Sequence, residues 1–179
     1  MGKFNNKISA EFHPPKKWIL ERALTYTNKD IDEGALGAVG VACKNSKITC
    51  AKNFETDLAS VPRAIWWLIS PWDIARAAII HDLLYKRIRQ YREKNEKPIR
   101  IGSKYNSFEG NTYREIVVQN VLTASIYKQA KKASDSVFLM AMKDATPKVP
   151  KWKMYAAYYA VVLCGRWSII PRDGDNEQL

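Results

Sequence analysis

The sequence has few cysteines and no long apolar run, and these shortages exclude several classes of protein. Three cysteines among 179 residues are too few for a disulfide framework, and no CxxC pair is present to bind zinc. The longest apolar runs, residues 137–142 and 156–164, are far shorter than the ~20 residues of a membrane-spanning helix. The N-terminal residues contain no apolar segment of the signal-peptide type. We therefore expect synthesis and residence in a reducing cytoplasm.

The composition is that of one globular domain with a basic surface. Hydrophobic residues make up 46% of the chain and charged residues 26%, as in ordinary folded domains. Six Trp, nine Tyr and five Phe exclude a disordered chain. The net charge of +11 favours an anionic partner, which can be nucleic acid, anionic lipid or an acidic protein.

The chain up to about residue 60 is predicted to be rich in β-strands. Strands are expected at residues 17–26, 36–43 and 47–54. The last two form a pair, with Asn45 and Ser46 as the turn between them.

Helices are predicted for the rest of the chain. They cover residues 74–92, 112–143 and 151–165, where apolar residues recur at helical spacing. Asp73 is expected to cap the first helix, and the acidic residues 171–179 to form a mobile tail. The sequence therefore predicts one α+β domain over 1–179. A small N-terminal antiparallel sheet, in about 1–60, precedes three main helices in about 73–165.

Two ionisable residues lie on the apolar faces of predicted helices. His81 lies among apolar residues of the first helix, and Asp135 shares a stripe with Phe138 and Met142 on the second. A buried carboxylate is costly unless it is paired, so we expect the two groups to meet. A histidine oriented by a carboxylate is the minimal general-base device, but a buried histidine is more often structural. Both interpretations stay open.

Three motifs point to a family. The sequence carries TDLASVPR at 56–63, HDLLY at 81–85 and SDSVF at 134–138. This pattern, over about residues 45–165, resembles the bacteriophage and prophage family catalogued as domain of unknown function 1353. Ser134 stands where alanine is usual, and Lys131 and Lys132 stand where an arginine is usual. The resemblance implies a phage gene product that is made in the host cytoplasm and then joins the virion, in its tail, with other virion proteins as partners.

The helix motif is also similar to the catalytic core of secreted and parvoviral phospholipase A2. In that core, HDxxY lies on one helix and an aspartate from a second helix faces the histidine. The resemblance implies a role for each matching residue: His81 as general base, Asp135 as the group that orients it, and Tyr85 as a supporting hydrogen-bond donor. It also implies that Asp82 binds calcium, which would polarise the ester carbonyl.

The segment before this helix departs from the phospholipase pattern. Those enzymes place a glycine-rich calcium loop there, whereas residues 57–63 contain no glycine. The disulfides of those enzymes are absent too. Asp57 can supply a carboxylate to calcium as a second ligand. Alternatively, Asp57 pairs with Arg63 and braces the loop, which Ser60 also supports.

Residues 86–104 carry eight Lys and Arg against two Glu. This stretch is either a solvated face or an anionic-surface contact made by Lys86, Arg87, Arg89 and Arg92. Such clusters gain roughly 1 kcal/mol per cation near anionic lipid. Tyrosines interleave with the charges, as in single-strand binders, but no recognised nucleic-acid motif is present.

Two aromatic groups are expected to pack inside the protein. They are Trp66, Trp67 and Trp72 before the first helix, and Tyr155, Tyr158 and Tyr159 on the third, with the tyrosine hydroxyls at the rim. If the tryptophans are exposed instead, they form an interfacial anchor or a partner-docking patch.

The sequence slightly favours a virion-associated structural or adaptor protein, in which His81, Asp82 and Asp135 form a buried polar brace. A calcium-assisted, phospholipase A2-like ester hydrolase is the first alternative, and a basic nucleic-acid-binding protein is the second.

Overall fold

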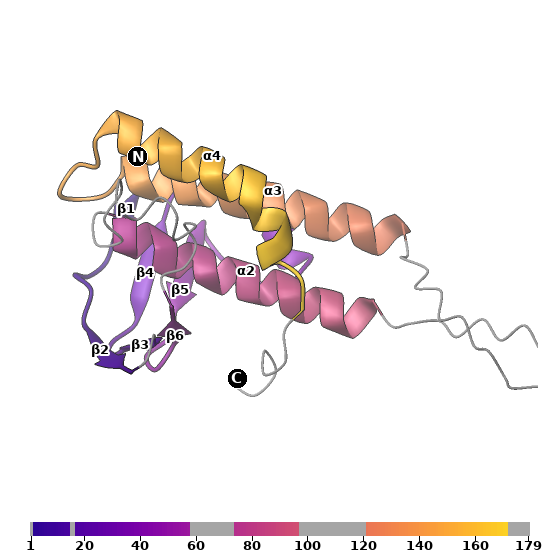
Figure 1. Ribbon diagram of the computed structural model, residues 1–179, viewed down its shortest axis with the longest axis horizontal. Coiled ribbons are helices and arrows are strands. Elements are labelled where there is room, and N and C mark those ends of the chain that lie inside the picture. Colours follow the sequence, from indigo (N-terminus) through magenta and orange to yellow (C-terminus); the bar gives the residue numbers. More distant parts are fainter. Residues whose placement is uncertain (1, 15–16, 58–73, 97–120, 172–179) are drawn as a thin grey trace, which may run out of the picture.

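The structure, a computed structural model, describes residues 2–14, 17–57, 74–96 and 121–171. Two three-stranded antiparallel sheets form the N-terminal part, and three long helices follow them (Figure 1). The predicted α+β class is confirmed, although the strands form two small sheets and not one.

The strands of the N-terminal segment are divided between two sheets. One sheet has the order β1 (Lys3–Phe4), β4 (Leu24–Thr27), β5 (Lys47–Cys50). The other has the order β2 (Ala10–His13), β3 (Lys17–Leu20), β6 (Glu55–Thr56). The single strand predicted over 17–26 is therefore wrong, because the chain leaves one sheet after Leu20 and enters the other at Leu24.

The predicted turn at Asn45 and Ser46 is confirmed. Both residues have a φ of 55°, and Lys44 is bridged to Lys47 across the turn. Left-handed backbone at both central residues is typical of a two-residue hairpin, and asparagine is favoured there.

The strand predicted at 36–43 is wrong, because a short helix, α1 (Glu33–Gly37), occupies its beginning. Asp32 starts this helix by accepting the backbone N–H of Ala35 at 2.9 Å. The side chain of Leu36 is then buried in the core.

β5 is shorter than the strand predicted at 47–54. Ile48 and Cys50 are buried while Lys47 and Thr49, which alternate with them, are exposed, as in a strand with one face in the core. The chain then turns through Asn53, whose φ is 67°, into β6.

The three predicted helices are confirmed in type and order. They are α2 (Ala75–Asn95), α3 (Val121–Lys143) and α4 (Lys151–Ser168). α4 continues past Gly165, the predicted end, to Ser168. No helix within the described ranges is long and apolar enough to cross a membrane.

The helices form the larger part of the core. α4 lies along α3, both lie on one side of α2, and the strands lie on the other side near the N-terminal half of α2 (Figure 1). α2 runs antiparallel to α3, which is its main packing partner. One continuous cluster of buried side chains joins the sheets to the helices; it includes Leu20, Tyr26, Ile48, Ile80, Leu84, Ile88, Phe138, Ala141 and Val161.

Tyr155 and Tyr159 do not pack as predicted, because they are 41% and 58% exposed on the outer side of α4. Tyr158 is half-buried. Several predicted features lie outside the described residues: Ser60, Arg63, Trp66, Trp67, Trp72, Asp73, the start of the second helix at Thr112, and the acidic tail from Arg172 onward.

Candidate functional site

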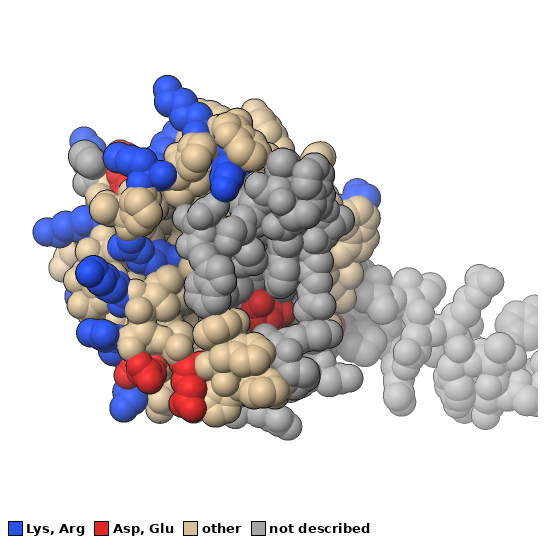
Figure 2. Space-filling view, turned by 60° about the vertical axis from the view of Figure 1, so that its left-hand side comes forward, with Lys and Arg blue, Asp and Glu red and all other residues tan. Residues whose placement is uncertain are grey.

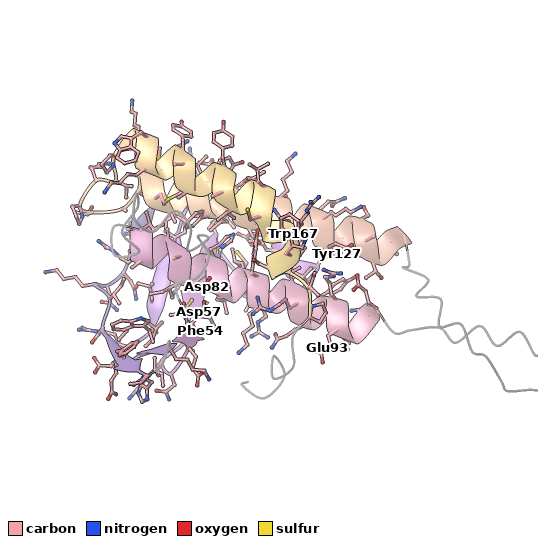
Figure 3. All side chains as sticks on the ribbon, viewed as in Figure 1. Phe54, Asp57, Asp82, Glu93, Tyr127 and Trp167 are labelled. Carbon is pink, nitrogen blue, oxygen red and sulfur yellow. The ribbon has the colours of Figure 1, made fainter. Side chains whose placement is uncertain are left out.

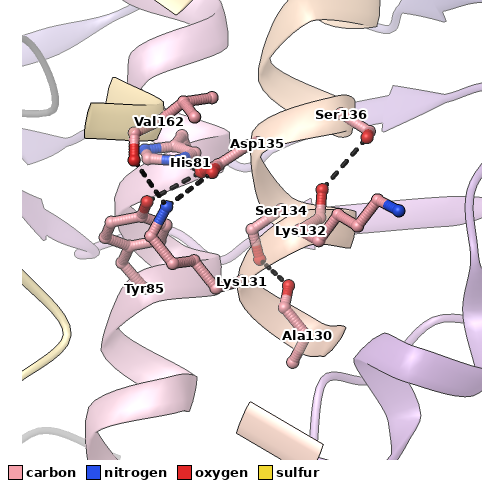
Figure 4. A network of polar contacts seen from close by, with 9 residues as sticks. All are labelled: His81, Tyr85, Ala130, Lys131, Lys132, Ser134, Asp135, Ser136 and Val162. Atoms are coloured by element: carbon pink, nitrogen blue, oxygen red, sulfur yellow. Dashed lines mark hydrogen bonds and ion pairs between the residues drawn. The ribbon is translucent and has the colours of Figure 1, made fainter. Parts of the chain in front are cut away.

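The antiparallel packing of α2 and α3 brings His81 and Asp135 together in the core. The Nε2 atom of His81 lies 3.2 Å from Oδ1 of Asp135, and the two side chains are 0% and 5% exposed (Figure 4). An ionised carboxylate only accepts hydrogen bonds, so this contact places a proton on Nε2.

Two further donors hold the carboxylate of Asp135. The hydroxyl of Tyr85, one turn after His81, donates to Oδ1 at 2.7 Å. The ammonium of Lys131, one turn before Asp135, donates to Oδ2 at 2.7 Å. Burial alone would raise the pKa of Asp135, but the hydrogen bonds from His81, Lys131 and Tyr85 favour the ionised form and lower it below its usual value.

The pKa of Tyr85 is shifted upward, in contrast to that of Asp135. Burial and the neighbouring charge of Asp135 raise the pKa of Tyr85 far above its usual value. The hydroxyl therefore stays protonated and remains a donor at any physiological pH.

The second ring nitrogen of His81, Nδ1, is buried and has no hydrogen-bond partner within the described part of the chain. The ring itself is held by two aromatic neighbours, with centroid distances of 4.0 Å to Tyr85 and 4.9 Å to Phe138. The imidazole is thus fixed in place, with one nitrogen bound to a carboxylate and the other unpaired.

α4 closes the cluster on a third side. Gly165 is buried, and a Cβ added there would lie 2.2 Å from the Tyr85 hydroxyl. Lys131 also donates to the carbonyl of Val162 at 3.4 Å (Figure 4). A glycine is therefore required at position 165 for Tyr85 to reach Asp135.

Asp82 faces a different direction from His81. It accepts a hydrogen bond from the hydroxyl of Thr56 on β6, on the side of α2 that faces the strands. Asp57 follows Thr56 on that same side (Figure 3). The structure thus places Asp82 apart from the pair that the sequence grouped it with.

The predicted calcium site lies only partly within the described residues, because the loop at 58–63 that precedes the helix is outside them. No group of three or more His, Cys, Asp or Glu side chains within the described ranges could hold a metal ion. The carboxylate of Asp82 is engaged by Thr56.

The four basic residues predicted to contact an anionic surface separate into two pairs. Arg89 and Arg92 donate to the carbonyls of Ser168 and Ile169, at 3.1 and 2.8 Å. These carbonyls end α4 and have no partner within the helix, so both arginines cap it.

Lys86 and Arg87 point elsewhere, into a pocket between α2 and the β5–β6 turn. The pocket has a volume of about 440 Å³ and also includes Lys52 and Phe54. Lys86 and Arg87 therefore line a pocket, whereas Arg89 and Arg92 cap α4.

Sequence reasoning missed two members of the cluster. Lys131 carried a signal, because a lysine four residues before a buried aspartate lies on the same helical face. No sequence signal identifies Gly165, since its role depends on how closely α4 approaches α2.

The fold and the cluster can now be compared with known families. Residues 39–161 match the family described as protein of unknown function (DUF1353). The chain belongs to the DUF1353 family. The match begins just after α1 and ends within α4, so the DUF1353 segment contains His81, Tyr85, Lys131 and Asp135. No curated protein and no solved structure matches the chain.

Proposed function

We propose that this DUF1353 protein is a hydrolase whose general base is Nδ1 of His81. The proposal rests on one observation: Nδ1 is buried and unpartnered within the described residues, on a ring whose other nitrogen is bound to a carboxylate. A buried polar atom without a partner costs about 1–3 kcal/mol. An arrangement that bears this cost favours a function in which Nδ1 meets water or substrate.

The contacts around His81 suit a base at Nδ1. The ammonium of Lys131 forms an ion pair with Asp135, and Nε2 of His81 bonds the same carboxylate. With its proton on Nε2, the neutral ring has its lone pair on Nδ1. Tyr85 and Lys131 are positioning residues in this proposal, because they act through Asp135.

The reaction would proceed by general-base catalysis. Nδ1 takes a proton from water as the water oxygen attacks an ester carbonyl, and Asp135 stabilises the imidazolium that forms. When the carbon–oxygen bond to the leaving alcohol breaks, Nδ1 returns the proton to that oxygen. A carboxylic ester is the substrate class favoured by the similarity of HDLLY to the phospholipase A2 helix.

Calcium has no step in this proposal, because the described residues do not form a site for it. The complete burial of His81 imposes a further requirement. Catalysis needs an opening that admits water and an ester to Nδ1. A permanently closed cluster would be a structural brace.

Fatty-acid release from mixed phosphatidylcholine and phosphatidylglycerol vesicles tests the proposal, with calcium and with chelator. We expect release by the wild type and a loss of at least 100-fold, the usual contribution of a general base, in His81→Gln. Ser134→Ala is the matched control. It removes a buried hydroxyl beside Asp135 that, among the described residues, bonds the Ala130 carbonyl and does not contact His81, and it should leave release unchanged.

Equal release by the wild type and His81→Gln would contradict the proposal. No release, together with a lower melting temperature for His81→Gln, would favour the brace and a virion adaptor role. The adaptor role has its own test, which is the presence of the protein in mass spectra of purified phage particles.

A further inference from the structure

The outer side of α4 is apolar along its whole length. Large hydrophobic side chains recur there every three or four residues and are exposed; they are Trp152, Tyr155, Tyr159, Leu163 and Trp167, and the exposed Ile170 follows the end of the helix. We call this set the α4 outer face. Figure 3 shows ring-bearing side chains projecting from α4 away from the other helices.

This face is large for a surface feature. A full aromatic side chain has roughly 150–250 Å² of surface, so four of them about half exposed contribute about 400 Å². That area matches the largest apolar patch of an ordinary monomer, a patch that is often functional. The opposite side of α4 is buried through Met154, Ala157 and Val161, so the core does not require the outer face to be apolar.

The segment that carries the α4 outer face contains Lys and Arg but no Asp or Glu. The sequence has no Asp or Glu between Asp144 and Asp173, a stretch in which the described cations are Lys148, Lys151, Lys153 and Arg166. In Figure 2, Lys and Arg side chains spread over the left and upper parts of the molecule, and most visible acidic side chains lie lower.

Each tryptophan on the face has a cation beside it. The Lys153 ammonium lies 5.7 Å from the Trp152 ring near the start of α4, and the Arg166 guanidinium lies 4.1 Å from the Trp167 ring near its end. Tryptophan beside Lys or Arg is typical of helices that lie in a membrane interface, where the ring enters the headgroup layer and the cation meets lipid phosphate.

We propose that the α4 outer face binds the surface of an anionic phospholipid bilayer, with α4 lying parallel to it. The charge of the face selects this occupant over a second copy of the chain. In a two-fold dimer through α4, Lys148, Lys151 and Arg166 would lie near the same cations of the second copy, and residues 145–172 supply no Asp or Glu to offset them, which is unfavourable. This inference does not depend on the chemistry of His81.

Vesicle co-sedimentation with two matched variants tests the proposal. Leu163 on the face is 69% exposed, and Leu122 on α3 is 65% exposed. Leu163→Ser and Leu122→Ser therefore make the same change at equal exposure, on and off the face. The vesicles contain one part phosphatidylglycerol to three parts phosphatidylcholine, or phosphatidylcholine alone.

We expect the wild type and Leu122→Ser to bind the anionic vesicles equally. Leu163→Ser should bind about tenfold more weakly, because one fewer leucine enters the interface. Binding should weaken in high salt and be lower on phosphatidylcholine alone. Tryptophan fluorescence should shift to shorter wavelength on binding.

Three results would overturn the proposal. The first is a folded wild type that does not bind anionic vesicles. The second is equal binding by Leu163→Ser and Leu122→Ser, which would place the lipid contact elsewhere. The third is a dimer that only Leu163→Ser dissociates, or a single-stranded oligonucleotide that only Leu163→Ser fails to bind, without vesicle binding in either case.

Discussion

At the scale of single residues, the negative charge of Asp135 governs the His81 cluster. Its pKa is lower in the folded protein than its usual value, because the hydrogen bonds from His81, Lys131 and Tyr85 outweigh burial. A carboxyl group of this kind stabilises the fold at pH values above its ordinary pKa. The contribution is lost as the pH falls through the lower pKa of the folded state.

Asp135→Asn should therefore cost less stability in acid than at neutral pH. At neutral pH we expect a loss of about 3–5 kcal/mol, as for other broken buried pairs. The difference from the wild type should narrow as the pH falls below 3.8, the ordinary value. Urea unfolding across a pH series measures it, with Ser134→Ala as a control that follows the wild type. A difference that stays constant in acid would mean that Asp135 is not ionised in the folded protein.

The sequence placed His81 and Asp135 on apolar stripes of two helices, and that mismatch of residue and face predicted their approach. Tyr85 was identified as a site residue from the HDxxY motif. Asp82 was grouped with them because it follows His81, but neighbours in a helix point about 100° apart, and it turns to Thr56.

At the scale of secondary structure elements, the C-terminal end of α4 is held to α2 by two arginines and by a close contact at Gly165. Arg89 and Arg92 cap its final carbonyls. Gly165 lets the Tyr85 hydroxyl approach the helix backbone. The position of α4 thereby fixes the donor that holds Asp135.

Gly165→Ala should destabilise the protein by about 1–3 kcal/mol, the usual cost of overpacking, because the new methyl group would meet the Tyr85 hydroxyl. Thermal unfolding measures this loss. Gly37→Ala is the control: it adds a methyl group in α1 with nothing within 4 Å and should be neutral or stabilising.

Tyr85→Phe removes the atom that the methyl group meets. In that background, Gly165→Ala should cost less than in the wild type. Equal costs in both backgrounds would contradict the contact.

Long helices could be predicted from the sequence because apolar spacing persists over many turns. The small strands could not be placed as well, since β1 and β6 have two residues each and pair only through distant partners. α1 was taken for a strand because its five residues give too short a pattern to separate the two periods.

At the scale of the whole molecule, Asp144 joins the N-terminal sheet to the end of α3. Its Oδ2 atom accepts from the backbone N–H of Gly2, the hydroxyl of Tyr26 and the amide of Asn28, at 2.9, 2.7 and 3.0 Å. These donors lie more than a hundred residues away in the sequence. No periodic pattern in the sequence predicts such a contact.

Asp144→Ala should therefore lower the free energy of unfolding by about 1–3 kcal/mol, because buried donors lose their acceptor. Chemical unfolding followed by circular dichroism measures the change. Asp30→Ala, at an exposed aspartate nearby, is the control and should stay within about 0.5 kcal/mol of the wild type. Equal stability of the two variants would contradict the role of Asp144.

The claim that His81 offers Nδ1 as a base is tested most directly by ¹⁵N NMR of its imidazole ring, which needs no substrate. The chain has two histidines, so His13→Gln leaves His81 as the single imidazole. For the neutral ring we predict the proton on Nε2 and a bare Nδ1. A neutral ring with its proton on Nδ1 would contradict the claim.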